Sequence, residues 1–136
     1  MSDHVEFHDS DLLAVEQVGR QVRISLDAYV HRWEQVDGCW KGTGWLQRVT
    51  AVLDDSQASG IPEVPVELSD GVLRTGSATY DGLVPLPFSS SEPASLELTL
   101  QTGAQFRVAG VSIAITSTSE ARYLEDLPDT FAPSAC

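Results

Sequence analysis

The sequence is poor in basic residues, and this shortage limits the partners it can bind. Eight Lys and Arg stand against 20 Asp and Glu among 136 residues, which gives a net charge of −12 at pH 7. Binding to nucleic acid requires a surplus of Lys and Arg to neutralise phosphates. The charge therefore argues against a nucleic-acid-binding protein.

Long apolar runs and leader sequences are also missing. No segment approaches the ~20 apolar residues that a membrane-spanning helix needs. The N-terminus, MSDHVEFHDSD, lacks the positive and apolar regions of a signal peptide. We therefore expect a cytoplasmic protein without membrane contact. In that compartment Cys39 and Cys136 are expected to be free thiols, with a disulfide between them as the less favoured alternative.

The length and apolar content fit one folded domain. Domains usually run to about 100–150 residues, and hydrophobic residues make up 42% of this chain, enough for a packed core. We assign residues 1–128 to a single β domain. Residues 129–136 are expected to form a frayed tail.

Apolar and polar residues alternate along most of the chain, which is typical of half-buried strands. The pattern predicts strands over residues 11–18, 21–30, 42–53, 64–69, 72–80, 83–88, 96–102 and 106–115. Gly19-Arg20 is expected to close a hairpin, and Asp70-Gly71 and Asp81-Gly82 the two turns of a three-stranded meander. Pro85 and Pro87 remove hydrogen-bond donors from one side of residues 83–88, which favours an edge strand.

About eight strands with these turn signals predict an all-β fold. We expect an antiparallel β-sandwich, with a closed β-barrel as the alternative. The sandwich is preferred because a proline-blunted strand implies a sheet with an edge. A slip of the apolar phase at Ala109-Gly110 predicts a β-bulge. One short helical turn is expected near the C-terminus, capped by Ser119 and ended by Pro128.

The N-terminal segment holds the best candidates for metal ligands. His4, His8, Asp9 and Asp11 carry side chains that bind zinc or manganese. In an extended chain, however, His4 and His8 stand about 13 Å apart. We therefore expect no metal or other cofactor, and Phe7 is expected to fix the N-terminus to the core. A metal-dependent enzyme remains the third hypothesis.

The run Phe7-His8-Asp9-Ser10-Asp11-Leu12, followed by an alternating strand, resembles the start of some small bacterial all-β proteins. Some similar proteins are immunity proteins of polymorphic toxin systems. The resemblance implies an all-β fold and the context of a toxin system. It assigns no catalytic residue.

Aromatic side chains provide a second candidate site. Tyr29, His31 and Trp33 share one face of the strand that contains them, and Trp45 follows in the next strand. Exposed rings of this kind stack on sugars or apolar ligands. The alternative is that these rings close the core.

No residue pattern points to nucleophilic catalysis. Gly110-Val111-Ser112 resembles part of a nucleophile elbow, but Ser112 lies within a predicted strand rather than at a strand-to-helix turn. The first hypothesis is therefore a non-enzymatic interaction protein, an immunity or inhibitor-type module that binds a basic protein. Its contacts are expected at exposed acids near turns: Asp9, Asp11, Asp54 and Asp55. The alternative function is a small-ligand or carbohydrate-binding domain that uses the aromatic face.

Overall fold

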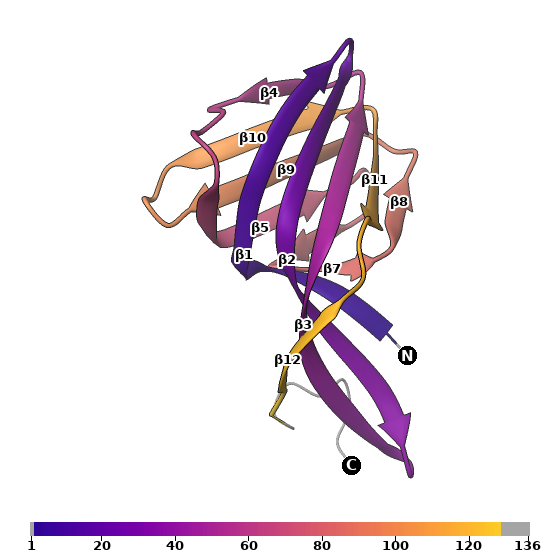
Figure 1. The fold of residues 1–136 in the computed structure, drawn as a ribbon. Helices are drawn as coiled ribbons and strands as arrows, with labels where there is room; N and C mark the ends of the chain where they lie inside the picture. The colour runs from indigo at the N-terminus through magenta and orange to yellow at the C-terminus, as the bar shows by residue number, and fades with distance from the viewer. Residues whose placement is uncertain (1, 129–136) are drawn as a thin grey trace.

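The computed structural model describes residues 2–128, and its regular structure is entirely β-strand (Figure 1). The strands are β1 (Ser2–Val18), β2 (Gln21–Val36), β3 (Cys39–Asp54), β4 (Gln57–Ser59), β5 (Val66–Arg74), β6 (Thr79–Asp81), β7 (Leu83–Leu86), β8 (Phe88–Ser90), β9 (Ala94–Leu100), β10 (Gln105–Gly110), β11 (Ser112–Ser117) and β12 (Arg122–Asp126). Within these residues no helix is long and apolar enough to cross a membrane. The all-β prediction is confirmed.

All the strand pairs are antiparallel and belong to one open sheet. Its order is β4-β10-β9-β5-β1-β2-β3-β11-β8, and β6, β7 and β12 pair with β5, β1 and β3 beside this path. The sheet folds into two layers, with β1, β2 and β3 in front of β5, β9 and β10 in Figure 1. Alternate side chains of both layers are buried between them, among them Leu12, Ile24, Leu53, Leu68, Leu98 and Phe106.

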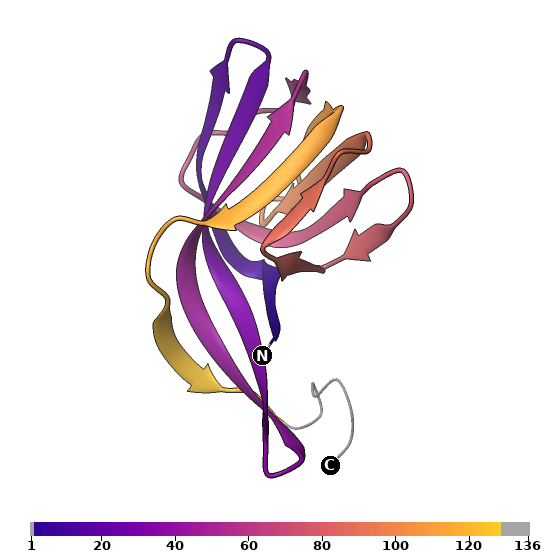
Figure 2. The same ribbon diagram turned by 90° about the vertical axis from the view of Figure 1, so that its right-hand side faces the viewer.

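The lower ends of β2 and β3 extend beyond the two layers as a long hairpin. Figure 2 shows this arm projecting away from the rest of the sheet. Register pairs continue to Val36 and Cys39 at its tip, and β12 pairs along the β3 side from Leu46 to Thr43. At this level the strand order is β7-β1-β2-β3-β12.

A bulge interrupts β1 at residues 7–10. Glu6 lies opposite Tyr29 and Asp11 lies opposite Asp27, so the four residues between them face a single residue of β2. Before the bulge β1 pairs with β7, and after it with β5. Phe7 is buried in the core, and its N–H donates to the Gly82 carbonyl at 3.0 Å. The bulge is therefore where β1 changes neighbours and bends between the arm and the two layers.

Several local predictions are confirmed. Gly19 has a positive φ of 62° and closes the hairpin between β1 and β2. The strands predicted over 21–30 and 42–53 lie within β2 and β3. The strand predicted over 83–88 is divided, since β7 ends at Leu86 and Phe88 begins β8, which pairs with β11. Among the described strands β7 pairs only with β1, as expected of an edge strand that contains Pro85.

The predicted meander is wrong. Asp70 and Gly71 do not form a turn but lie inside β5, where a register shift follows Leu68. Gly82 does adopt a positive φ of 83°. The strands beside it do not form a hairpin, because β6 pairs with β5 and β7 pairs with β1.

Two further predictions are corrected by long-range pairing. The expected C-terminal helical turn is absent because β12 finds backbone partners along β3, and the Ser119 hydroxyl accepts a hydrogen bond from the N–H of Arg48. The phase slip at Gly110 is not a bulge within one strand. The chain leaves β10 there, which pairs with β9, and enters β11, which pairs with β3. The predicted tail, 129–136, lies outside the described residues.

Gly71 is required by packing rather than by a turn. A Cβ built at this position would lie 2.6 Å from the Phe7 ring and 2.9 Å from Leu98. We predict that Gly71→Ala lowers the free energy of unfolding by about 1–3 kcal/mol, as overpacked cores usually do. The cost should fall in a Phe7→Leu background, measured by urea unfolding. An equal cost in both backgrounds would show that the Phe7 contact is not its cause.

Candidate functional site

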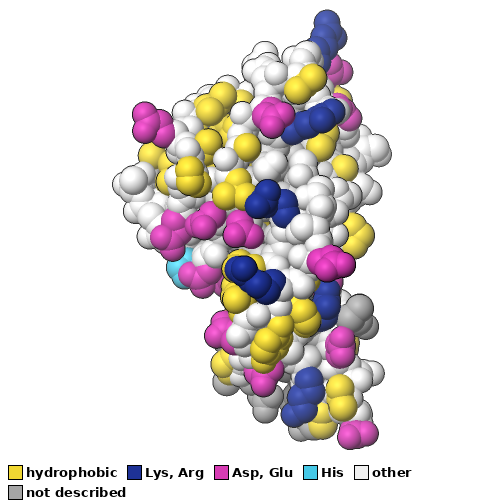
Figure 3. All heavy atoms as spheres, in the orientation of Figure 1, with side chains coloured by type: hydrophobic (Ala, Val, Ile, Leu, Met, Phe, Trp, Pro, Cys, Tyr) yellow, Lys and Arg dark blue, Asp and Glu magenta, His cyan; other side chains and the backbone are white. Residues whose placement is uncertain are grey.

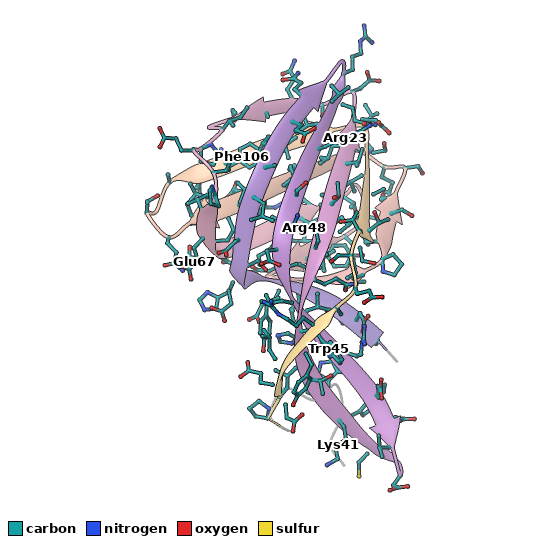
Figure 4. The ribbon with its side chains drawn as sticks, viewed as in Figure 1. Arg23, Lys41, Trp45, Arg48, Glu67 and Phe106 are labelled. Carbon is teal, nitrogen blue, oxygen red and sulfur yellow. The ribbon has the colours of Figure 1, made fainter. Side chains whose placement is uncertain are left out.

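Three carboxylates form a row across the outer face of neighbouring strands. Asp11 of β1 lies directly opposite Asp27 of β2 on one side and Glu67 of β5 on the other. The adjacent residues in the same strands, Leu12 and Leu26, are buried in the core, so the carboxylates lie on the opposite, outer face of the sheet. We call Glu67, Asp11 and Asp27 the acidic row. Figure 3 shows acidic side chains gathered on this face. Figure 4 labels Glu67, at one end of the row, and Arg48, which lies beyond the other end.

The carboxylates of the acidic row are not held in salt bridges. None of its three side chains forms a salt bridge within residues 2–128. Arg48 of β3 faces Asp27 across the sheet and ends the row. Like charges directly opposite each other destabilise a β-sheet. The row therefore concentrates negative charge at a cost in stability.

The bulge of β1 places two more polar groups beside the row. His8 and Asp9 are exposed, and the His8 Nδ1 donates to the Ser69 carbonyl at 3.0 Å. The other ring nitrogen lies 3.5 Å from the Asp9 carboxylate. Asp9 has a positive φ of 69°, which is uncommon for a residue other than glycine. Asp9 lies on the same face as the row, because it lines a cavity together with Tyr29, two residues after Asp27 in β2.

Below the row, a polar cavity of about 430 Å³ opens between β1, β2 and β12. Its lining includes Glu6, Tyr29, His31 and Glu125. His31 Nε2 donates to the Glu6 carboxylate at 2.7 Å, and the Tyr29 hydroxyl donates to Glu125 at 2.5 Å. Burial and the hydrogen bond to Glu125 raise the pKa of Tyr29 well above its usual value. Tyr29 is therefore a neutral donor at physiological pH.

Two glycines of β3 make room for the aromatic rings of β2. A Cβ on Gly44 would collide with the Tyr29 hydroxyl, and one on Gly42 would lie 2.5 Å from the Trp33 ring. The rings therefore lie close against the β3 backbone. Sequence reasoning missed this role, although Gly42 and Gly44 alternate with the same period as the aromatic residues.

The predicted aromatic site is not an exposed stacking surface. Tyr29, His31 and Trp33 are 8%, 7% and 4% exposed. Trp45 lies on the opposite face of the arm, beneath the Arg32 guanidinium at 4.7 Å. The structure thus places Trp45 apart from the three aromatic residues of β2 and brings those three together as packed groups.

The candidate metal ligands are not brought together. His4 lies opposite His31 in the register of β1 and β2, whereas the side chain of His8 turns toward Ser69. Burial and the neighbouring His31 lower the pKa of His4. Among residues 2–128 no group of three His, Cys, Asp or Glu side chains has the arrangement of a metal site.

Asp54 and Asp55 lie apart from the acidic row, at the end of β3. The carboxylate of Asp54 accepts hydrogen bonds from Gln21 and Ser112, which lower its pKa. Asp55 has a positive φ of 42° and lies 3.6 Å from Arg20. Both residues thus have hydrogen-bond or ion-pair partners near the end of β3. Sequence reasoning included them but missed Asp27 and Glu67, which reach the row only through strand pairing.

Cys39 lies at the tip of the arm and is disulfide-bonded. The expectation of a free thiol at this position is therefore wrong. Cys136, the other cysteine of the sequence, lies outside the described residues.

Comparison with known proteins gives no relative. The sequence matches no protein-family model and no curated protein, and the structure matches no solved structure.

The hydrogen bond from Tyr29 to Glu125 predicts a pH-dependent stability. Tyr29→Phe should lower the free energy of unfolding by about 1–3 kcal/mol at pH 7, because the bond to a charged acceptor is lost. The raised pKa means that the folded state holds its proton above pH ~10, where the unfolded state releases it. Wild-type stability should therefore fall as the pH rises above about 10.

Urea unfolding between pH 7 and 11 measures this loss, which should be smaller in Tyr29→Phe. Tyr80→Phe is a matched control, because Tyr80 packs against Phe88 through its ring. An equal alkaline loss in wild type and Tyr29→Phe would contradict the assignment.

Proposed function

We propose that this protein is a non-enzymatic interaction module that binds a basic protein through the acidic row. The observation that carries the proposal is the adjacency of Glu67, Asp11 and Asp27 on three neighbouring strands, none of which forms a salt bridge within the described residues. Groups that only stabilise a fold are seldom kept in mutual repulsion. A basic partner would relieve this repulsion on binding.

The charge of the whole molecule supports the same proposal. A net charge of −12 attracts a basic partner over roughly one Debye length, about 8 Å at physiological ionic strength. The row and Asp9 concentrate that field on one face. Such focusing raises association rates more than it slows dissociation.

Within this function, an immunity or inhibitor-type role agrees with the sequence resemblance. The residues that carry the resemblance, 7–12, form the bulge and the first residues after it. They place Asp9 and Asp11 on the acidic face. We further propose that the two layers are those of a β-sandwich, whose rigid outer face presents the row.

The other two hypotheses have weaker support. A ligand-binding aromatic face requires exposed rings, and three of the four proposed residues are buried. A metal-dependent enzyme requires His4, His8 and Asp9 to converge, but His4 and His8 have different neighbours.

Charge-matched variants test the proposal. The first neutralises the row with Asp11→Asn, Asp27→Asn and Glu67→Gln. The control neutralises three exposed acids elsewhere: Glu16→Gln, Glu63→Gln and Asp81→Asn. With poly-L-lysine as the basic probe, stopped-flow association at low salt should slow roughly tenfold in the first and much less in the control.

The difference should disappear at high salt, because exposed charges are screened. Equal slowing in both variants would mean that only net charge matters, and the row would then not be a binding site.

A further inference from the structure

The two edges of the sheet in the arm differ in how they are protected. At this level the strand order is β7-β1-β2-β3-β12, so β7 and β12 are the edges. Proline protects β7, since Pro85 cannot donate a hydrogen bond. β12 contains neither Pro nor Lys, all five of its residues are exposed, and it pairs only with β3 among the described strands. An edge of this kind is a template for another strand.

Side chains hold β12 in place without a second neighbour. The Tyr29 hydroxyl donates to Glu125 at 2.5 Å, and the Tyr123 ring packs edge-on against Trp45 at 5.5 Å. Just before β12, the Gln47 amide donates to the Ser119 carbonyl at 2.9 Å. The strand is therefore ordered before a partner arrives, which reduces the entropy cost of binding.

Large apolar side chains line the same strand. Tyr123 is 51% exposed and Leu124 is 43% exposed. Leu124 is the extra residue of a bulge, because Tyr123 lies opposite Trp45 and Glu125 lies opposite Gly44. Bulges redirect side chains and often occur beside functional sites.

We propose that the β12 edge receives an extended segment of the basic partner as an added strand. This inference rests on the proposed function and specifies how the partner would bind. Strand addition uses backbone hydrogen bonds for affinity and alternate side chains for specificity.

Charge and position both favour a basic segment at this edge. Glu120, Glu125 and Asp126 lie in or beside β12, against a single base, Arg122. The edge also lies near the acidic row, because the backbone N–H of Arg48, the residue opposite Asp27, donates to the Ser119 hydroxyl, three residues before β12. A second copy of this chain would instead bring a further charge of −12 to the edge.

The test uses an eight-residue peptide of alternating Lys and Val, with blocked ends. Two derivatives carry methyl groups on alternate backbone nitrogens. One is methylated at the odd-numbered residues and the other at the even-numbered residues. The N–H groups of alternate residues point to the same edge of a strand, and only one edge of the added strand forms hydrogen bonds to β12. The derivative methylated on that edge should bind at least about tenfold more weakly than the unmodified peptide, and the other derivative should keep its affinity. Hydrogen exchange should show protection of residues 122–126 by the unmodified peptide.

Protein variants provide a matched comparison. Leu124→Lys adds a charge to the β12 edge, where lysine opposes strand addition. Leu83→Lys adds the same charge to the β7 edge, where the leucine is similarly exposed at 41%. The peptide should lose affinity for Leu124→Lys at least about tenfold and keep it for Leu83→Lys.

Other outcomes would overturn the inference. Equal affinity of the two methylated derivatives, with protection near Asp11 and Asp27, would leave the acidic row as the binding site and reject the edge. If the peptide binds the row variant and Leu124→Lys as tightly as it binds the wild type, the proposed function is rejected as well. A dimer in sedimentation that Leu124→Lys dissolves would identify a second copy as the occupant instead.

Discussion

The bulge at residues 7–10 of β1 is the constraint on which the rest of the structure depends. It accommodates four residues opposite one, buries Phe7 between the layers and lets β1 change from β7 to β5. The buried Ser10 hydroxyl bridges the bulge, accepting from the Tyr29 N–H at 2.9 Å and donating to the Glu6 carbonyl at 2.5 Å. Gly71 leaves space for the Phe7 ring. One local irregularity thus connects the two layers with the arm.

The same irregularity sets the chemistry of the outer face. Above the bulge Asp11 stands between Asp27 and Glu67, and below it Glu6 faces His31 in the polar cavity. The two groups of carboxylates differ in their surroundings. Those of the cavity have hydrogen-bond donors, whereas those of the row have none within residues 2–128. The first group stabilises the arm, and the second is the one that we propose a basic partner contacts.

Local sequence patterns predicted the class of fold and the longest strands, because alternation and the Gly19 turn depend only on neighbouring residues. They failed where distant pairing decides. Asp70-Gly71 has turn chemistry but lies within β5, and residues 122–126 pair with β3 instead of forming a helix. The residues of the acidic row also differ in whether local sequence could identify them. Asp9 and Asp11 could be chosen from their place near a predicted turn, whereas Asp27 and Glu67 join them only through strand register.

The carboxylates of the acidic row lie opposite one another despite their mutual repulsion. A double-mutant cycle with Asp11→Asn and Asp27→Asn measures this directly, by urea unfolding at low salt. This repulsion predicts that Asp11→Asn, whose opposite neighbours on both sides are acids, stabilises the fold by about 0.2–1 kcal/mol. It also predicts that the double variant gains less than the sum of the two, because the first change already removes the repulsion. Additive changes, or destabilisation by Asp11→Asn, would mean that the two carboxylates do not repel each other in the folded protein.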